Sequence, residues 1–81
     1  MSKKELKRIL KNLCDYKEWC IIKPSLYISD DHKCLIVDVY DKTYGSLYHV
    51  FMDVEKRYFT YQFLSAFGIH DTKRNSLDRF M

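Results

Sequence analysis

Two segments of the chain, residues 33–41 and 46–54, alternate apolar and polar side chains with a period of two. In each segment one set of alternate positions is apolar: Leu35, Val37 and Val39 in the first, and Tyr48, Val50, Met52 and Val54 in the second. This alternation is typical of strands buried on one face. The intervening DKTYGS contains Gly45 and is typical of a turn. The pattern predicts an antiparallel hairpin.

A third strand is expected to precede this hairpin. The segment WCIIKPSLYIS, residues 19–29, is rich in β-branched and aromatic residues, and SDDH at 29–32 is typical of a turn. Pro24 has no N–H to donate to a ladder, which favours an edge strand or a bulge at that position. Sequential strands joined by short turns predict an antiparallel meander.

The N-terminal segment predicts a helix over residues 3–16. Ser2 and Glu5 form an S-x-x-E capping box. The apolar residues that follow have helical spacing and share one side of a helical wheel: Leu6, Ile9, Leu10 and Leu13. An amphipathic helix of this kind is expected to pack on one face of the sheet, and the other face, although uncovered, would not be very polar.

The C-terminal third is open to two interpretations. Residues 57–67 contain RYFTYQF, which suits a fourth strand, but Thr60 could instead cap a helix that runs to Phe67 and ends at Gly68. The helix is favoured. Ser76 is expected to cap a short terminal helix. The sequence therefore predicts one α+β domain over residues 1–81, with an N-terminal helix on a three- or four-stranded antiparallel meander and a short C-terminal helical segment.

Charge is distributed in blocks along the chain. Residues 1–23 carry seven basic and three acidic side chains, a net +4, and residues 56–81 carry a net +3. Residues 24–55 carry two basic and six acidic side chains, a net −4. This layout favours electrostatically guided association over a uniformly basic nucleic-acid surface.

Five basic side chains gather on the side of the predicted helix opposite its apolar stripe: Lys3, Lys4, Lys7, Arg8 and Lys11. The pairs at i, i+4 repel one another, at a cost of about 0.2–0.5 kcal/mol each. An ordinary solvated face explains them best. The alternatives are an acidic protein partner, the acidic middle of a second copy, or nucleic acid. Membrane binding is not expected, because the apolar stripe is narrow and the chain contains no run of about 20 apolar residues.

The chain has 13 aromatic residues, seven of them tyrosine, which is more than the core of one small domain requires. Most of these rings are expected in the core or at its rim. The remainder would lie at the surface, where tyrosine and tryptophan anchor protein interfaces. The aromatic residues predicted to contact a partner are Trp19, Tyr27, Tyr40 and Tyr48.

No catalytic or cofactor motif is present. His49 and Asp53 are expected on one strand face, with Asp38 across from them, but no nucleophile accompanies them. Cys14, Cys20, His32 and Cys34 lack the short C-x2–4-C hook of structural zinc sites. The two glycines form neither a P-loop nor a dinucleotide fingerprint. The sequence therefore predicts no enzymatic activity, no metal, no cofactor and no small-molecule substrate.

Three cysteines cannot all pair within one chain, and no export signal is evident, so free thiols in the cytoplasm are expected. Ten lysines against four arginines, with a single alanine, fit the AT-rich codons of a bacteriophage or a low-GC bacterium. The predicted function is a small, non-enzymatic protein-binding module, as an accessory or inhibitor protein. It would act through exposed aromatics and the basic helix face, with self-association allowed. Nucleic-acid binding by the basic helix is the alternative.

Overall fold

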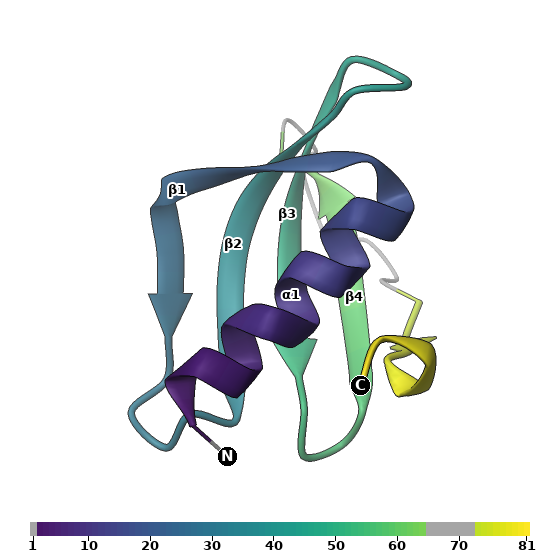
Figure 1. The fold of residues 1–81 in the computed structure, drawn as a ribbon. Helices are drawn as coiled ribbons and strands as arrows, with labels where there is room; N and C mark the ends of the chain where they lie inside the picture. Colours follow the sequence, from purple (N-terminus) through teal and green to yellow (C-terminus); the bar gives the residue numbers. More distant parts are fainter. Residues whose placement is uncertain (1, 65–72) are drawn as a thin grey trace.

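The structure is a computed structural model that describes residues 2–64 and 73–81. A helix packs on a five-stranded antiparallel sheet of strand order β1-β2-β3-β4-β5, and a short 3-10 helix follows (Figure 1). The predicted α+β class and the antiparallel meander are confirmed. The elements are α1 (Lys3–Lys17), β1 (Trp19–Ile28), β2 (Cys34–Asp41), β3 (Ser46–Asp53), β4 (Tyr58–Phe63), β5 (Asn75–Ser76) and η1 (Asp78–Phe80).

Helix α1 begins where its sequence predicts and ends one residue later than predicted, at Lys17. The Ser2 hydroxyl accepts a hydrogen bond from the backbone N–H of Glu5 at 3.1 Å, which satisfies one of the free donors of the first turn. Glu18 adopts the left-handed conformation, with φ of 59°, and its N–H returns to the carbonyls of the last turn. The buried side chains lie on one stripe: Leu6, Ile9, Leu10, Leu13 and Cys14.

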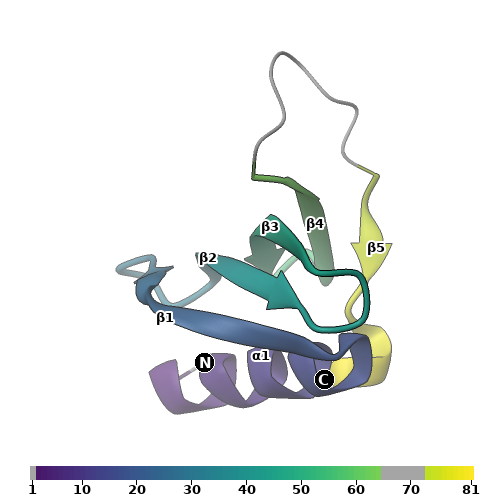
Figure 2. The same cartoon turned by 90° about the horizontal axis from the view of Figure 1, so that it is seen from above.

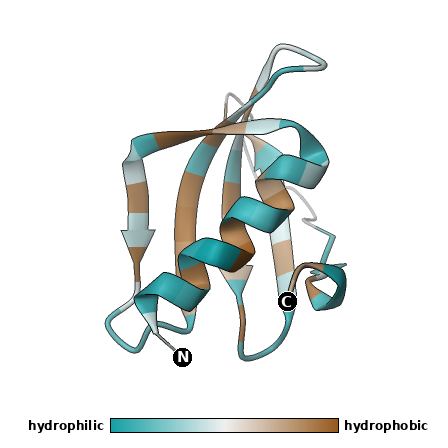
Figure 3. Cartoon of the chain, in the orientation of Figure 1, coloured by the Kyte–Doolittle hydropathy of each residue, from teal (hydrophilic) through white to brown (hydrophobic). Residues whose placement is uncertain are grey.

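The molecule has two layers, because α1 and η1 lie on the same side of the sheet. Figure 1 shows α1 crossing the sheet diagonally, and Figure 2 shows that no described element lies over the opposite side of β2 and β3. The core fills the space between the layers, where the helix stripe meets apolar side chains of the strands. Figure 3 shows the hydrophobic positions along α1 and the strands in brown. Its sheet-side members are Leu35, Val37, Val39, Val50, Met52 and Phe59, and Leu77 and Phe80 close one end.

Strand β1 contains the bulge that Pro24 predicts. Ile22 pairs with Asp38, but the next pair is Tyr27 with Ile36, so four residues of β1 face one residue of β2. The Ser25 hydroxyl spans this gap: it donates to the carbonyl of Ile22 at 2.6 Å and accepts the N–H of Asp38 at 2.8 Å. β1 bends sharply at this point (Figure 1).

Replacing Ser25 by alanine is expected to lower the free energy of unfolding by about 1–3 kcal/mol, because two backbone groups lose their partner. Urea denaturation followed by circular dichroism measures the loss. Ser25→Thr keeps a hydroxyl and should recover most of it. Equal stability of Ser25→Ala and the native chain would show that the hydroxyl does not hold the bulge.

The favoured interpretation of residues 57–67 is wrong for the residues that the structure describes. Tyr58–Phe63 form strand β4, which pairs with β3, so the fourth strand is present where a helix was favoured. Phe59 and Tyr61 alternate towards α1 opposite Met52 and Val50, and this pairing outweighs the local capping signal. Residues 65–68, with the proposed end of the helix, lie outside the described residues.

The C-terminal segment is helical as predicted, but its helix is shorter and begins later: Ser76, the expected cap, lies in strand β5, and the N-cap residue of η1 is Leu77. The two residues of β5 pair with β4, and η1 follows. The Ser76 hydroxyl accepts the backbone N–H of Asp78 at 3.1 Å. Leu77 and Phe80 are buried against the core, which ties this segment to the N-terminal helix.

Candidate functional site

The side of the sheet that faces away from α1 is the candidate site, and we call it the open face. Its residues occupy the strand positions that alternate with the core positions, and the register aligns them in rows across the sheet. The open face comprises Cys20, Ile22, Tyr27, Cys34, Ile36, Asp38, Tyr40, Leu47, His49, Phe51, Asp53, Tyr58, Thr60 and Gln62.

The open face exposes large apolar side chains. Tyr27 is 61% exposed, and Tyr40 and Leu47 are each 42% exposed. Ile36 and Phe51 lie half-buried beside Tyr27, and these three residues line much of a shallow hollow of about 190 Å³. The exposed apolar side chains form two groups, one around Tyr27 and one at Tyr40 and Leu47, on the same face of the sheet. Grouped exposed apolar side chains are more informative than isolated ones, because they mark interaction sites.

A histidine–carboxylate pair lies in the middle of the open face. His49 and Asp38 are opposite each other on β3 and β2, and His49 Nδ1 lies 2.7 Å from Asp38 Oδ1. The carboxylate orients the imidazole and leaves Nε2 as the ring nitrogen that can contact a partner. Asp53, which the sequence places on the same strand face, instead accepts the N–H of Lys56 at 2.9 Å. The pair places a carboxylate and an imidazole nitrogen, two hydrogen-bonding groups, between the apolar side chains of the open face.

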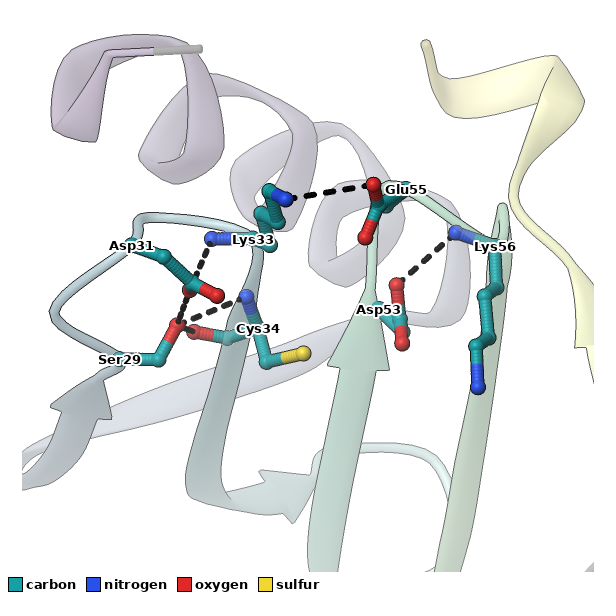
Figure 4. Close-up of polar contacts among 7 residues, drawn as sticks. All are labelled: Ser29, Asp31, Lys33, Cys34, Asp53, Glu55 and Lys56. Carbon is teal, nitrogen blue, oxygen red and sulfur yellow. Dashed lines mark hydrogen bonds and ion pairs between the residues drawn. The ribbon is translucent and has the colours of Figure 1, made fainter.

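A network of polar contacts fixes the two loops at one end of the sheet (Figure 4). The Ser29 hydroxyl donates to Asp31 at 2.6 Å and accepts the N–H of Cys34 at 3.0 Å. The bond from the Ser29 hydroxyl, with the bond from the Lys33 N–H to the same carboxyl, lowers the pKa of Asp31 below its ordinary value. Lys33 forms an ion pair with Glu55 at 3.2 Å, which joins this loop to the loop after β3. These contacts therefore hold in place the loop residues that border the hollow beside Tyr27.

The charge of the open face is acidic. Strands β2, β3 and β4 contain no lysine or arginine, so the charged or titratable side chains that they place on the open face are Asp38 and His49, with Asp53 at its edge. A phosphate backbone laid across the middle of these strands would meet carboxylates, and at the β4 end the Arg74 guanidinium lies 4.3 Å from the centre of the Tyr58 ring.

The basic residues of α1 lie on the other side of the molecule. The five that form the predicted basic face are all exposed: Lys3, Lys4, Lys7, Arg8 and Lys11. Arg8 lies 3.7 Å from Glu5, and Lys11 lies 3.2 Å from Asp15. Because the sheet separates α1 from the open face (Figure 2), the aromatic and basic surfaces that the sequence predicts do not form one contiguous site.

Two of the four predicted partner-binding aromatics do not lie on the open face. Trp19 is only 5% exposed, its Nε1–H donates to Asp41 at 3.2 Å, and its ring packs against Tyr48 and Tyr61. The prediction that Trp19 is exposed is therefore wrong, because Trp19 begins β1 on the side that faces α1. Tyr48 is half-buried on that same side. Tyr27 and Tyr40 do lie on the open face.

Three apolar residues of the open face are not among the partner-binding residues that the sequence predicts: Ile36, Leu47 and Phe51. The sequence pattern could have identified them, because each lies in a strand position that alternates with the buried positions. What the alternation alone could not show is which of the two sets α1 covers.

The three cysteines occupy different environments. Burial raises the pKa of the Cys14 thiol to about 12. Cys20 is exposed, and the pKa of the half-buried Cys34 is raised by burial and by the nearby Asp53 carboxylate. Within residues 2–64 and 73–81, no three His, Cys, Asp or Glu side chains converge in a way that could hold a metal ion.

These environments predict an order of thiol reactivity and a pH dependence of stability. Cys20 should react first with iodoacetamide, Cys34 more slowly, and Cys14 only on unfolding.

Since the unfolded Cys14 thiol ionises near 9.0 and the folded one near 12, the contribution of Cys14 to the free energy of unfolding is complete below pH 9. It is then lost as pH rises, by up to about 1.4 kcal/mol per unit. Urea denaturation at rising pH, compared with Cys14→Ala, measures this term. An equal slope in both proteins would contradict it.

Comparison with known proteins gave no match: no family model, no curated protein and no solved structure is significantly similar to this chain. Of the helices in the described part of the chain, none combines the length and the apolarity that a membrane span requires.

Proposed function

We propose that this protein is a non-enzymatic, cytosolic protein-binding module whose contact surface is the open face. The observation that carries the proposal is the exposure of Tyr27, Tyr40 and Leu47 on a sheet face over which no described element lies. Tyrosine supplies a large contact area at a low entropic cost. An accessory or inhibitor role, as the sequence predicts, would use this surface.

The chemistry of the open face favours one kind of occupant. Its apolar side chains surround the Asp38–His49 pair, so a partner should bring an apolar centre together with a neutral or basic hydrogen-bonding group. A second copy of the chain fits less well, since face-to-face packing would oppose two segments that each carry a net −4. The proposed partner is therefore a different protein, with a neutral or basic contact surface.

Affinity capture with matched tyrosine variants tests the proposal. Tyr27 and Tyr16 are similarly exposed, at 61% and 56%, but Tyr16 belongs to α1, on the far side of the sheet. The native protein, Tyr27→Glu and Tyr16→Glu are each immobilised and exposed to extract from the cell of origin. We expect a protein that native and Tyr16→Glu retain equally and that Tyr27→Glu loses. Equal retention by all three variants, or retention of nucleic acid alone, would contradict the proposal.

Nucleic-acid binding by α1 is the second candidate, because Lys3, Lys4 and Lys7 are exposed and form no ion pair within the described residues. Fluorescence anisotropy with duplex DNA at physiological salt separates it from the proposal. We expect no affinity tighter than the non-specific range of about 10⁻⁴–10⁻⁶ M. Tighter binding that is abolished by Lys3→Glu, Lys4→Glu and Lys7→Glu together would favour the second candidate.

A further inference from the structure

A groove of about 670 Å³ lies between α1 and β1, on the side of the molecule away from the open face. Apolar side chains from both elements form part of its lining: Leu10 from the helix, and Trp19, Ile21 and Leu26 from the strand. Figure 2 shows α1 and β1 running side by side along this edge of the molecule. The groove is therefore bounded by a helix on one side and an edge strand on the other.

Three lysines line the same groove. Lys7 and Lys11 lie one helical turn apart on α1, and Lys23 comes from the β1 bulge. Asp15 is the acidic residue that lines the groove, and it already pairs with Lys11 at 3.2 Å. The lining is therefore cationic over an apolar base, and an anionic group placed there would relieve the repulsion between Lys7 and Lys11.

The strand beside the groove has a free edge. β1 is the outermost strand of the sheet, and within residues 2–64 and 73–81 no strand pairs with its other side. Its regular part before the bulge, Trp19–Ile22, is four residues, or about 13 Å long. The groove-lining part of α1, from Lys7 to Asp15, spans about 12 Å. The free part of β1 and the facing part of α1 therefore each have the length of an extended segment of about four residues.

We propose that this groove binds a short, extended, acidic segment of a partner protein, which adds to the sheet along the edge of β1. Backbone hydrogen bonds to Trp19–Ile22 hold the segment, and its alternate side chains pack on Leu10 and Ile21. Its carboxylates lie between Lys7 and Lys23. The bulge at Pro24 ends the available edge, which limits the length of the bound segment and guards against open-ended pairing of β1 with other chains.

The probe is a fluorescent eight-residue peptide in which valine alternates with glutamate, measured by anisotropy. The affinity of the variant with Lys7→Glu and Lys23→Glu should fall about tenfold or more. The matched control is Lys3→Glu with Lys4→Glu, which makes the same change in net charge on residues outside the groove. This control should retain near-native affinity. A peptide with N-methylated backbone amides should bind at least about tenfold more weakly, because it cannot extend the sheet.

Amide chemical shifts of the labelled protein locate the peptide. We expect the perturbed signals to fall within residues 7–15 and 19–26. The proposal would be overturned if the two double-lysine variants lost peptide affinity equally. It would also be overturned if the N-methylated peptide bound as tightly as the unmodified one, or if the perturbed signals were confined to the open face. Absence of binding by the glutamate peptide would overturn it too, and so would tight binding of laurate in its place, which would assign the groove to a lipid.

Discussion

Replacing Leu13 by alanine is expected to lower the free energy of unfolding by about 2–5 kcal/mol. The Leu13 side chain is 0% exposed and packs between α1 and the sheet, so the substitution leaves a cavity that the surrounding structure can only partly fill. A domain of this size has an unfolding free energy near the low end of about 5–15 kcal/mol, so the variant should be close to unfolding at 37 °C. Urea denaturation at 10 °C, monitored by circular dichroism, measures the change.

Leu47→Ala is the matched control, because it removes the same atoms from the open face, where Leu47 is 42% exposed. We expect this variant to lose less than about 1 kcal/mol. Comparable losses at Leu13 and Leu47 would mean that both faces of the sheet are covered in the folded protein, and they would remove the structural basis for an open face.

The second large effect is expected at Asp41. This carboxylate is buried and accepts three hydrogen bonds: from Trp19 Nε1 at 3.2 Å and from the backbone N–H groups of Thr43 and Tyr44 at 2.8 and 3.0 Å. Asp41→Ala removes the two oxygens that accept these three hydrogen bonds, so the buried indole N–H loses its partner and the β2–β3 turn loses two bonds. We expect a loss of about 2–4 kcal/mol, measured by urea denaturation and accompanied by a change in the near-ultraviolet signal of Trp19.

Asp41→Asn keeps one side-chain oxygen of the same shape, and we expect it to lose less stability than Asp41→Ala. The exposed Asp30 in the β1–β2 loop provides the surface reference, with an expected change within about 0.5 kcal/mol on substitution by alanine. If Asp41→Ala proves no more damaging than Asp30→Ala, then the contacts of this carboxylate with Trp19 and the turn do not stabilise the fold.

The parts of the fold that the sequence predicts well are those fixed by local chemistry. The cap at Ser2 and the helical spacing from Leu6 to Leu13 define α1 without reference to the rest of the chain. The β2–β3 hairpin follows from strict alternation and a turn at Gly45, where φ is 68°. The bulge follows from the missing N–H of Pro24. In each of these cases, propensity, pattern and turn chemistry agree.

Strand β4 shows where local chemistry is insufficient. Thr60 and the residues around it suit either a helix start or a strand, and the choice is made by pairing with β3, a contact that no local pattern contains. The predicted exposure of Trp19 was wrong for a related reason. Trp19 begins an edge strand, a position that is usually exposed, yet its ring is buried and its N–H donates to Asp41. Both outcomes depend on residues distant in the sequence.

The open face was only partly predictable. Tyr27 and Tyr40 were identified, and a second sheet face of low polarity was expected, but the side on which α1 lies is a tertiary choice. Because α1 lies on the side opposite the open face, the basic helix face and the exposed tyrosines form two separate surfaces, although the sequence predicts that they act together. The groove between α1 and β1 was not predicted, because it arises from Lys7, Lys11 and Lys23 meeting across two elements.

Site-specific photo-crosslinking in the cell of origin tests the function of the open face most directly. A photoreactive phenylalanine analogue replaces Tyr27 in one sample and Tyr16 in another, two tyrosines of similar exposure on opposite sides of the sheet. We expect one discrete protein adduct from position 27 and none from position 16. Adducts to the same protein from both positions, or from position 16 alone, would contradict the claim that the open face is the contact surface.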